Sequence, residues 1–585
     1  MKIALHITHE AVQKIGGIGS VIAGLATSSS YRNYYDRTIL YGPLFNTEGN
    51  PSSRLGKDGV VLYSGIDNYD MEKYTHIFAP IEKKYGIGIV YGKRIMANET
   101  NPGHANEIET ILIHINNMKT ETVDRLKFML WESYGIQSER YGDWDYEQYV
   151  RIAVPYAEIL KGLTSKDDAV THFSHEYMGM ACALKITIDR NKGLFKNHRT
   201  IFYAHEVSTS RSITENLPGH DISFYGIMDR TDTDRISMES IFGDRSEYYR
   251  NELVKRTIHL DKIFAVSSLI AKEIKFLNPG IDDKKIEVVY NGIFHKKIDL
   301  KAKKSSRETI KKYCKTLFNY TPDAIFTHVT RLVSSKGLWR DVMLLEELDE
   351  LFESNSMTGF YILLSTLIGT GRPAQDVARM ENEYGWPVMH KEGWPDLVGM
   401  ESEVYSGIEH FNAKSKAIKA VFINQFGFNR HSTGNRIPEN AHWIDLRTGS
   451  DAEFGMSVYE PFGIAQIETV PFGSVAVLSD ACGCADLIKN KFKSAPDAFH
   501  IIEFTKGIKE ASDEKIMNLD APGRREIEKD MIRKEAENIF TKVAGVCSEK
   551  DMDTHLKNAQ RLSMEIDWDH IVLNNIIPVL KKIHI

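Results

Sequence analysis

The chain has 585 residues, of which 42% are hydrophobic and 26% are charged, so we expect a globular protein with more than one domain. The net charge of −7 argues against a general affinity for nucleic acid. No apolar run approaches the ~20 residues of a membrane span, and the N-terminus enters a short strand without a secretory leader. The five scattered cysteines do not resemble a disulfide framework. We therefore expect a cytoplasmic protein without nucleic-acid or membrane partners.

Strand-like and helix-like segments alternate through the first half of the chain. A buried strand is expected at 2–8, and a glycine loop followed by a helix at 12–28. The glycine spacing G-G-x-G differs from the dinucleotide pattern G-x-G-x-x-G, so a phosphate loop and a simple packing turn both stay open. Further strands are expected at 37–42, 93–98, 108–115, 169–174 and 199–205, and helices at 145–163 and 178–189. This alternation is typical of a largely parallel sheet, in which ligands bind at the carboxyl ends of the strands.

A long polar segment, 208–260, interrupts this series, and we expect its second half to be helical. Strands at 262–268 and 286–293, the latter with an Asn-Gly turn, close the first half of the chain. The segment 294–322 is rich in lysine and lacks a clear apolar face until its end. It is expected to be a surface linker or insertion.

A second alternating series begins with strands at 324–332, 360–371 and 420–427. It continues through 456–487, where an apolar strand breaks at Tyr459-Glu-Pro-Phe-Gly463 and a helix is expected to carry Glu468. Two such series predict an α/β protein with two Rossmann-like domains. We place the domains at 1–295, including the insertion of about 208–260, and at 296–560. The C-terminal segment 561–585 has helical periodicity and is expected to pack back towards the first domain.

Six sequence features, in the same order along the chain, resemble retaining glycosyltransferases of the GT-B fold and specifically glycogen synthases. They are EAVQ (10–13), Lys14-Ile-Gly16-Gly17, HFSHEYMGM (172–180), the insertion GHDISFYGIMDRTDTDR, Arg331-Leu-Val-Ser-Ser-Lys336-Gly337, and Tyr459-Glu460-Pro461-Phe462-Gly463 with Glu468. The insertion follows the animal and fungal branch of that family, whereas Gln466 and the Arg331 motif follow the bacterial branch. The resemblance spans most of the chain and implies two domains that face a central cleft.

The resemblance also implies roles for individual residues. Arg331 and Lys336 would neutralise the departing diphosphate, and fixed positive charge placed where negative charge develops is usually a large catalytic effect. His205 would lie beside the reacting glucose, and Glu460 would hold the ring hydroxyls, since a carboxylate accepts two vicinal hydroxyls at once. These four would be the catalytic residues. The residues implied to bind the donor are Lys14, Gly16, Gly17, Glu176, Asn291, Phe462, Gly463 and Glu468, the last of them at the ribose.

The implied reaction moves glucose from UDP-glucose or ADP-glucose to an α-1,4-glucan by a same-side displacement. No cofactor or metal is expected, and the D-x-D strings Asp143-Trp-Asp145 and Asp232-Thr-Asp234 are interpreted as solvated charges. The insertion resembles an assembly element, which implies a homo-oligomer. The pair Arg524-Arg525 is too sparse to indicate control by glucose 6-phosphate. The alternatives are a related transferase acting on a small sugar, a protein or a lipid, a nucleotide-sugar epimerase, and an inert glycan-binding protein.

Overall fold

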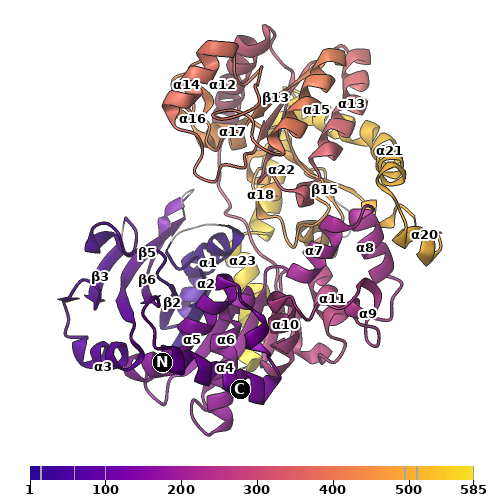
Figure 1. Ribbon diagram of the computed structural model, residues 1–585. Coiled ribbons are helices and arrows are strands. Elements are labelled where there is room, and N and C mark those ends of the chain that lie inside the picture. The colour runs from indigo at the N-terminus through magenta and orange to yellow at the C-terminus, as the bar shows by residue number, and fades with distance from the viewer. Residues whose placement is uncertain (13–15, 58, 99–100, 493–495, 509–510, 584–585) are drawn as a thin grey trace. The chain divides into compact units, whose positions relative to one another are not determined.

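The computed structural model describes residues 1–12, 16–57, 59–98, 101–492, 496–508 and 511–583 (Figure 1). The chain divides into two compact units. Unit 1 contains Met1–Ser210, Asp232–Phe294 and Asp567–Ile585, and unit 2 contains Arg211–Thr231 and His295–Ile566. Within the described residues, no helix combines the length and the apolar content that crossing a bilayer would need.

Unit 1 is built on a ten-stranded sheet in the order β10-β9-β8-β7-β1-β2-β6-β5-β3-β4. The strands from β10 to β6 are parallel, which confirms the expected parallel sheet, but β5, β3 and β4 add an antiparallel edge. Only residues 99 and 100 separate β5 from β6, and a parallel crossover needs a much longer connection. The bounds are β1 (Lys2–Ile7), β2 (Arg37–Pro43), β3 (Gly59–Ser64), β4 (Tyr69–Asp70), β5 (Gly88–Asn98), β6 (Asn101–His114), β7 (Ala169–His175), β8 (His198–Ala204), β9 (Lys262–Ala265) and β10 (Ile286–Val288).

The helices of unit 1 include two from the C-terminal end of the chain, α23 (Trp568–Ile571) and α24 (Ile577–Ile583), which pack against α2 (Figure 1). Asp569 accepts hydrogen bonds from the Ser28 hydroxyl (2.7 Å) and the Ser29 amide (2.6 Å) at the start of α2. A Cβ at Gly292 would lie 2.7 Å from the backbone of Trp568, so this turn has room only for glycine. The other helices are α1 (Gly17–Thr27), α2 (Ser29–Tyr34), α3 (Thr75–Tyr85), α4 (Thr120–Tyr134), α5 (Trp144–Leu163), α6 (Met180–Asn191), α9 (Met238–Phe242), α10 (Tyr249–Lys255) and α11 (Ser268–Leu277), with α7 (Ser208–Asn216) leading into unit 2.

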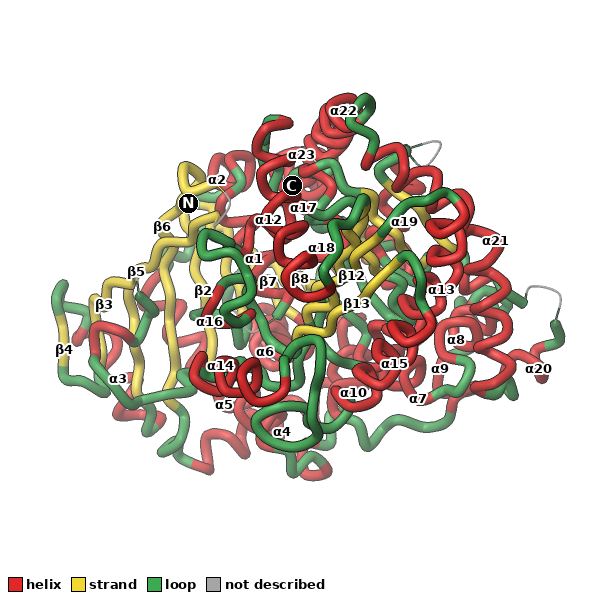
Figure 2. The backbone as a smooth tube through the Cα atoms, turned by 90° about the horizontal axis from the view of Figure 1, so that it is seen from above, coloured by secondary structure: helices red, strands yellow, loops and turns green. Residues whose placement is uncertain are grey.

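Unit 2 has a six-stranded, fully parallel sheet in the order β13-β12-β11-β14-β15-β16, of which Figure 2 shows β12 beside β13. This is the doubly wound order of Rossmann folds, with the first strand at the centre. Helices line both faces, so the predicted α/β class with two Rossmann-like domains is confirmed. The bounds are β11 (Ala324–Val329), β12 (Gly359–Leu364), β13 (Ile418–Ile423), β14 (Ala452–Gly455), β15 (Val475–Ser479) and β16 (Phe499–Ile502).

Two apolar cores hold these helices to the sheet. On one face α13 (Leu338–Ser354), α15 (Glu401–Lys414) and α21 (Ala521–Cys547) contribute buried leucine, isoleucine and phenylalanine side chains. On the other face α12 (Leu300–Phe318), α14 (Ala374–Tyr384) and α17 (Trp443–Gly449) contribute a more varied set of buried side chains, including Ile310, Met380 and Leu446. The remaining helices are α8 (His220–Met228), α16 (Arg430–Thr433), α18 (Ile464–Ile467), α19 (Gly483–Lys491), α20 (Asp513–Met517) and α22 (Met552–Glu565).

The expected surface linker at 294–322 is wrong, because α12 covers most of it. Ile310, Tyr313 and Cys314 are fully buried against the sheet of unit 2. Polar side chains are buried too: Lys303 donates to the carbonyl of Ser450 at 2.6 Å, and Arg307 pairs with Asp451. A helix that buries charged side chains in specific contacts has no clear apolar stripe, so the hydrophobic pattern missed it.

The insertion also differs from expectation, because residues 211–231 group with unit 2 rather than with the first half of the chain. A buried ion cluster around Arg340 on α13 ties this segment to unit 2. Its guanidinium contacts Asp221 on α8 at 2.7 and 3.0 Å and Glu528 on α21 at 2.8 Å, and all three side chains are fully buried. It also donates to the carbonyl of Met456 at 3.2 Å. A charge so deeply buried requires these partners.

We predict that Arg340→Met destabilises unit 2 severely, since the substitution leaves the buried Asp221 carboxylate without its ion-pair partner and leaves Glu528 with only Arg524, at 3.5 Å, as a cationic partner. Loss of one partner from a buried ion pair costs about 3–5 kcal/mol of unfolding free energy. The loss of unfolding free energy is measured by denaturant titration of the full chain, with tryptophan fluorescence as the probe. The matched control is Arg379→Met, because Arg379 is half exposed and pairs with Asp376 at 3.4 Å on the surface of α14. Such a pair contributes about 0–1 kcal/mol. Equal losses in the two variants would contradict the assignment.

Candidate functional site

The residues singled out from the sequence form two sets, one in each unit, and both sets follow strand ends. Glu176 follows β7, His205 follows β8, Arg331 follows β11 and Glu460 follows β14. In unit 2 the strands β11 and β14 are neighbours at the point where the strand order reverses, which is where ligands bind in such sheets. The unit 1 set is Gly16, Gly17, Glu176, His205 and Asn291, and the unit 2 set is Arg331, Lys336, Glu460, Phe462, Gly463 and Glu468. Lys14 lies outside the described residues.

The structure brings Lys336 and Glu460 together as an ion pair, although 124 positions separate them in the sequence. Both side chains are mostly buried, at 13% and 14% exposure. Backbone bonds from the amides of Val458 (2.8 Å) and Tyr459 (3.2 Å) to the carbonyl of Ser335 hold the two loops against each other. The loop after β11 and the loop after β14 therefore form one rigid site.

The turn after Glu460 requires glycine. Gly463 has φ +91°, and a Cβ there would lie 2.9 Å from Cγ of Glu460. The helix that follows, α18, has only four residues, so Glu468 ends it rather than lying within it as expected. The Phe462 side chain is 3% exposed and belongs to the core, which leaves only its backbone to meet a ligand.

Glu468 has a partner that the sequence did not indicate. Arg447 of α17 lies 3.2 Å from Glu468 and 3.2 Å from the buried Glu453 of β14. The Glu468 side chain is 40% exposed, so one side of its carboxylate faces solvent while the other is held by Arg447. Arg447 belongs to no recognised motif, and its role depends on a contact between a helix and a distant loop.

Arg331 differs from Lys336 in its surroundings. Its side chain is exposed, and among the described residues no ion pair or side-chain hydrogen bond is recorded for it. The unit 2 set therefore combines one cation held by a carboxylate with one cation facing solvent. Both follow the same central strand.

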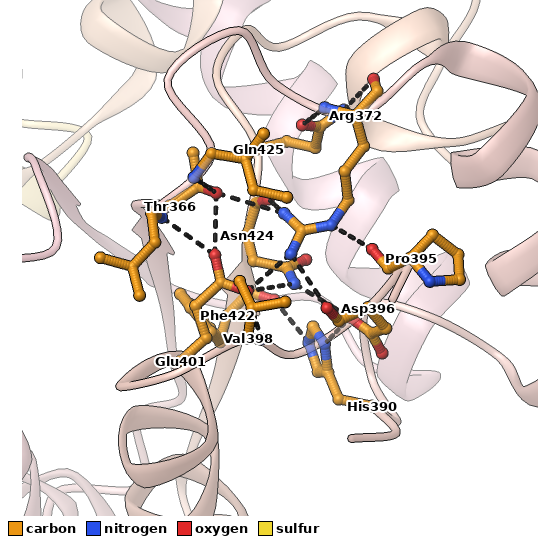
Figure 3. Close-up of polar contacts among 12 residues, drawn as sticks. Thr366, Arg372, His390, Pro395, Asp396, Val398, Glu401, Phe422, Asn424 and Gln425 are labelled. Atoms are coloured by element: carbon orange, nitrogen blue, oxygen red, sulfur yellow. Dashed lines mark hydrogen bonds and ion pairs between the residues drawn. The ribbon is translucent and has the colours of Figure 1, made fainter. Parts of the chain in front are cut away.

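A second polar cluster fixes the neighbouring strand ends of unit 2, as Figure 3 shows. The fully buried Arg372 bonds to Glu401 at 2.6 Å and to the carbonyls of Pro395, Asp396 and Asn424. Glu401 also accepts from the Thr366 hydroxyl at 2.8 Å. The cluster ties the loops after β12 and β13 to one another, so the carboxyl edge of the sheet is preorganised well beyond the recognised motifs.

In unit 1 the glycine loop is already occupied by a carboxylate of the chain itself. Glu10, 5% exposed, accepts from the amides of Gly16 (3.0 Å) and Gly19 (2.9 Å) at the start of α1. A Cβ at Gly16 would lie 3.3 Å from Glu10, but a Cβ at Gly17 would meet nothing within 4 Å. The space beside Gly17 is therefore open, and the close approach of a phosphate there stays a prediction.

Glu176 and Asn291 both lie in constrained positions. Glu176 has φ +56°, a conformation that costs a non-glycine residue about 1–3 kcal/mol and that often marks functional sites. Its Oε1 accepts from the amide of Glu206 at 2.6 Å, which connects the ends of β7 and β8. Asn291 is 4% exposed, and its Oδ1 has no hydrogen-bond partner among the described residues.

His205 ends a chain of buried side chains that begins at Tyr31. The hydroxyl of Tyr31 lies 2.8 Å from Nε2 of His6, Nδ1 of His6 lies 2.8 Å from Nε2 of His175, and Nδ1 of His175 lies 2.8 Å from Nε2 of His205. Burial lowers the pKa of His6 and of His205 to about 3 and lowers that of His175 well below its ordinary value. The three rings are therefore neutral at physiological pH. Of this chain, the sequence motifs include only His175, within HFSHEYMGM, and His205.

Unit 1 also contains a cavity of about 590 Å³ beyond the ends of β1 and β2. Its lining includes His9, Phe45, Asn46, Glu48, Arg54 and Arg94. Phe45 is 55% exposed, whereas Arg54 pairs with Asp67 at 3.0 Å and Arg94 donates to the carbonyl of Val12 at 2.8 Å. The two arginines are engaged by the protein, whereas the exposed Lys57 also lines the cavity, so the cavity offers an aromatic ring, an amide, a carboxylate and an ammonium group.

No group of three or more His, Cys, Asp or Glu side chains is placed to hold a metal in the part of the chain that the structure describes. Asp145 is not the solvated charge that was expected: it accepts from Tyr177 (2.6 Å), Tyr249 (2.5 Å) and Arg250 (2.9 Å). Burial opposes its ionisation, but these three bonds outweigh burial and lower its pKa. Asp232 and Asp234 are more than half exposed, as expected.

The sequence matches no known protein-family profile and no curated protein. Solved structures of similar arrangement include starch synthase IV from Arabidopsis thaliana bound to ADP and acarbose, with 14% identity over 96% of this chain and 99% of that one and a TM-score of 0.46. An α,α-trehalose-phosphate synthase (UDP-forming) from Burkholderia xenovorans in complex with glucose-6-phosphate has 12% identity, coverage of 96% and 99%, and a TM-score of 0.43. The α,α-trehalose-phosphate synthase (UDP-forming) from Burkholderia vietnamiensis has 12% identity over 99% of this chain and 98% of that one, with a TM-score of 0.47.

Proposed function

We propose that this protein is a retaining glucosyltransferase of the glycogen synthase type, which moves glucose from UDP-glucose or ADP-glucose to the non-reducing end of an α-1,4-glucan. The observation that carries the proposal is the Lys336–Glu460 ion pair beside Arg331, at the strand-order reversal of unit 2. A glycan-binding protein or an epimerase gives no reason for the whole set of motifs along the chain. In this pair the Lys336 ammonium suits a phosphate, and the Glu460 carboxylate suits sugar hydroxyls.

The leaving diphosphate is the centre of the chemistry in unit 2. The Lys336 ammonium has three N–H groups, of which Glu460 takes one, so two remain for phosphate oxygens. Arg331 adds a planar fork of donors that matches phosphate geometry. Together they stabilise the negative charge that grows as the glycosidic bond breaks. Glu460 accepts hydrogen bonds from glucose hydroxyls, and the exposed side of Glu468 accepts from the ribose.

The sugar develops positive charge in the same step. In the unit 1 set, the rings that lead to His205 are neutral and Glu176 is a carboxylate. Neither would repel an oxocarbenium-like glucose. A retaining glycosidase would need two carboxyl groups about 5 Å apart with one acting as nucleophile, and no residue of the set fits that role. The incoming hydroxyl is therefore proposed to attack from the side that the diphosphate leaves.

We assign the acceptor glucan to the cavity of about 590 Å³ in unit 1. Phe45 offers a ring on which a glucose can stack, and Asn46 and Glu48 offer hydrogen-bonding groups. A small sugar, a protein or a lipid headgroup is the alternative acceptor.

The proposal is tested by supplying UDP-glucose or ADP-glucose labelled in the glucose, each with glycogen as acceptor. We expect label in the polymer from one of the two donors, in linkages that an α-1,4-specific amylase releases. Label on glucose, glucose 6-phosphate or a lipid instead would identify the alternative transferase. Conversion of the donor without any acceptor would identify the epimerase. Absence of incorporation with both donors would refute the synthase.

We predict that Lys336→Ala lowers kcat by about a hundredfold, or roughly 3 kcal/mol in the transition state, because the leaving diphosphate loses a fixed positive charge. The KM for glycogen should change less than about twofold, since Lys336 is assigned to the donor side. The control is Lys416→Ala, which removes an exposed lysine paired with Glu353 at 2.8 Å. Turnover of Lys336→Ala equal to that of the control would remove Lys336 from the mechanism.

A separate prediction tests the acceptor cavity. Phe45→Ala should raise the KM for glycogen about fivefold, because one aromatic contact contributes about 1 kcal/mol, while the KM for the nucleotide sugar stays the same. Phe128→Ala is the matched control, since Phe128 is equally exposed at 57% but lies on α4. An unchanged KM for glycogen in Phe45→Ala would move the acceptor elsewhere.

A further inference from the structure

The chain of side chains from Tyr31 to His205 is continuous and almost sealed from solvent. Tyr31, His6 and His175 are at most 1% exposed, and each of the three contacts that join them to His205 measures 2.8 Å. Only His205, at the strand end, is partly exposed. Ring stacking restrains His205: the plane of its ring makes an angle of 10° with the ring of His175 and 18° with the ring of Tyr203.

Neutral rings impose one direction on all the hydrogen bonds of this chain. A neutral imidazole carries one N–H donor and one acceptor nitrogen, so every ring that accepts from one neighbour must donate to the next. A reversal at any one ring would set two N–H groups or two lone pairs against each other, with no water to relieve them. All three rings therefore share the same tautomer, either Nδ1–H throughout or Nε2–H throughout.

Tyr31 decides between these two directions. In the described part of the chain, the only side-chain contact recorded for its hydroxyl is Nε2 of His6. If the hydroxyl donates to His6, then Nδ1 of His6 donates to His175 and Nδ1 of His175 donates to His205, and each donor is satisfied. If the chain runs the other way, the phenol hydrogen has no acceptor in a fully buried position, which is costly.

We infer that Tyr31, His6 and His175 fix His205 in its Nδ1–H tautomer, so that His205 presents an N–H donor, and not an acceptor, at the end of β8. The inference deepens the proposed function and rests on it for the identity of the ligand. The N–H then donates to an oxygen of the glucose or of its phosphate. His205 cannot take a proton at Nδ1, so it is not a general base. Tyr31, His6 and His175 are positioning residues, since they act only through His205.

The orientation of Tyr31 is itself supported from a distant part of the sequence. The Ser28 hydroxyl accepts from the Tyr31 amide at 3.5 Å and donates to Asp569 at 2.7 Å. Asp569 belongs to α23, in the C-terminal segment of unit 1. The returning C-terminal segment thus helps to hold the helix that sets the direction of the relay.

The first test reads the tautomer directly and needs no activity. The full chain is labelled with ¹⁵N in its histidine rings, and the His205 signals are identified by their loss in His205→Gln. We expect the shift of a protonated nitrogen at Nδ1 and of an unprotonated nitrogen at Nε2. A protonated Nε2, alone or together with Nδ1, would overturn the inference, even if the protein proves to be a glucosyltransferase. The expected pattern would stand even if no transfer were found with any nucleotide sugar.

The second test removes the group that sets the direction. Tyr31→Phe deletes one hydroxyl, so His205 should populate both tautomers. We expect kcat to fall about tenfold. The KM for the active donor, UDP-glucose or ADP-glucose, should change less than about twofold. Tyr34→Phe is the matched control: it deletes a hydroxyl from the same helix, and that hydroxyl has no hydrogen-bond partner among the described residues. A Tyr31→Phe protein with the wild-type His205 spectrum would overturn the role of Tyr31. A mixed tautomer with unchanged kcat would overturn the coupling to catalysis.

Discussion

The buried guanidinium of Arg340 is the interaction on which the site in unit 2 depends. It lies in the first turn of α13, which Gly337 separates from Lys336, and it bonds to the carbonyl of Met456, which precedes Glu460 by one short loop. The two loops that supply the cation and the carboxylate are thus tied to one charge. That charge is tolerated only because Asp221 and Glu528 surround it, so the loops after β11 and β14 and the insertion form a single electrostatic unit.

This dependence explains why part of the insertion folds with unit 2. The segment 211–231 leaves unit 1 after β8, the strand that ends at His205, and returns to it before β9. Within that excursion Asp221 supplies one of the two carboxylates that Arg340 requires. A chain that contributes to both units in this way couples the integrity of the loops after β11 and β14 to a segment that comes from the first half of the sequence. The C-terminal segment does the reverse, since Asp569 anchors α2 in unit 1.

The sequence predicted the parallel strands well, because apolar runs that end in glycine or polar residues signal buried strands, and motif residues then fall at their ends. It could not predict the partners. Arg447 beside Glu468, Glu401 beside Arg372 and Tyr31 beside His6 are contacts between distant segments, and each residue alone looks like a surface or core residue. The α12 helix was missed for a related reason: Lys303 and Arg307 lie on its buried face, so the sequence shows no continuous apolar stripe there. The contact of Glu10 with the amides of Gly16 and Gly19 is another such partner, and the donor-binding role of the glycine loop stays a prediction.

The two sets of residues divide the charge of the proposed reaction between them. In unit 2, Arg331 and Lys336 are cations, as a leaving diphosphate requires. In unit 1, the described members Glu176, His205 and Asn291 carry no positive charge at neutral pH, because burial keeps the pKa of His205 at about 3. A charged imidazole beside a developing sugar cation would oppose the reaction. A relay of neutral rings avoids that repulsion, and it also supplies a directed N–H group, which a free histidine with two exchanging tautomers could not do reliably.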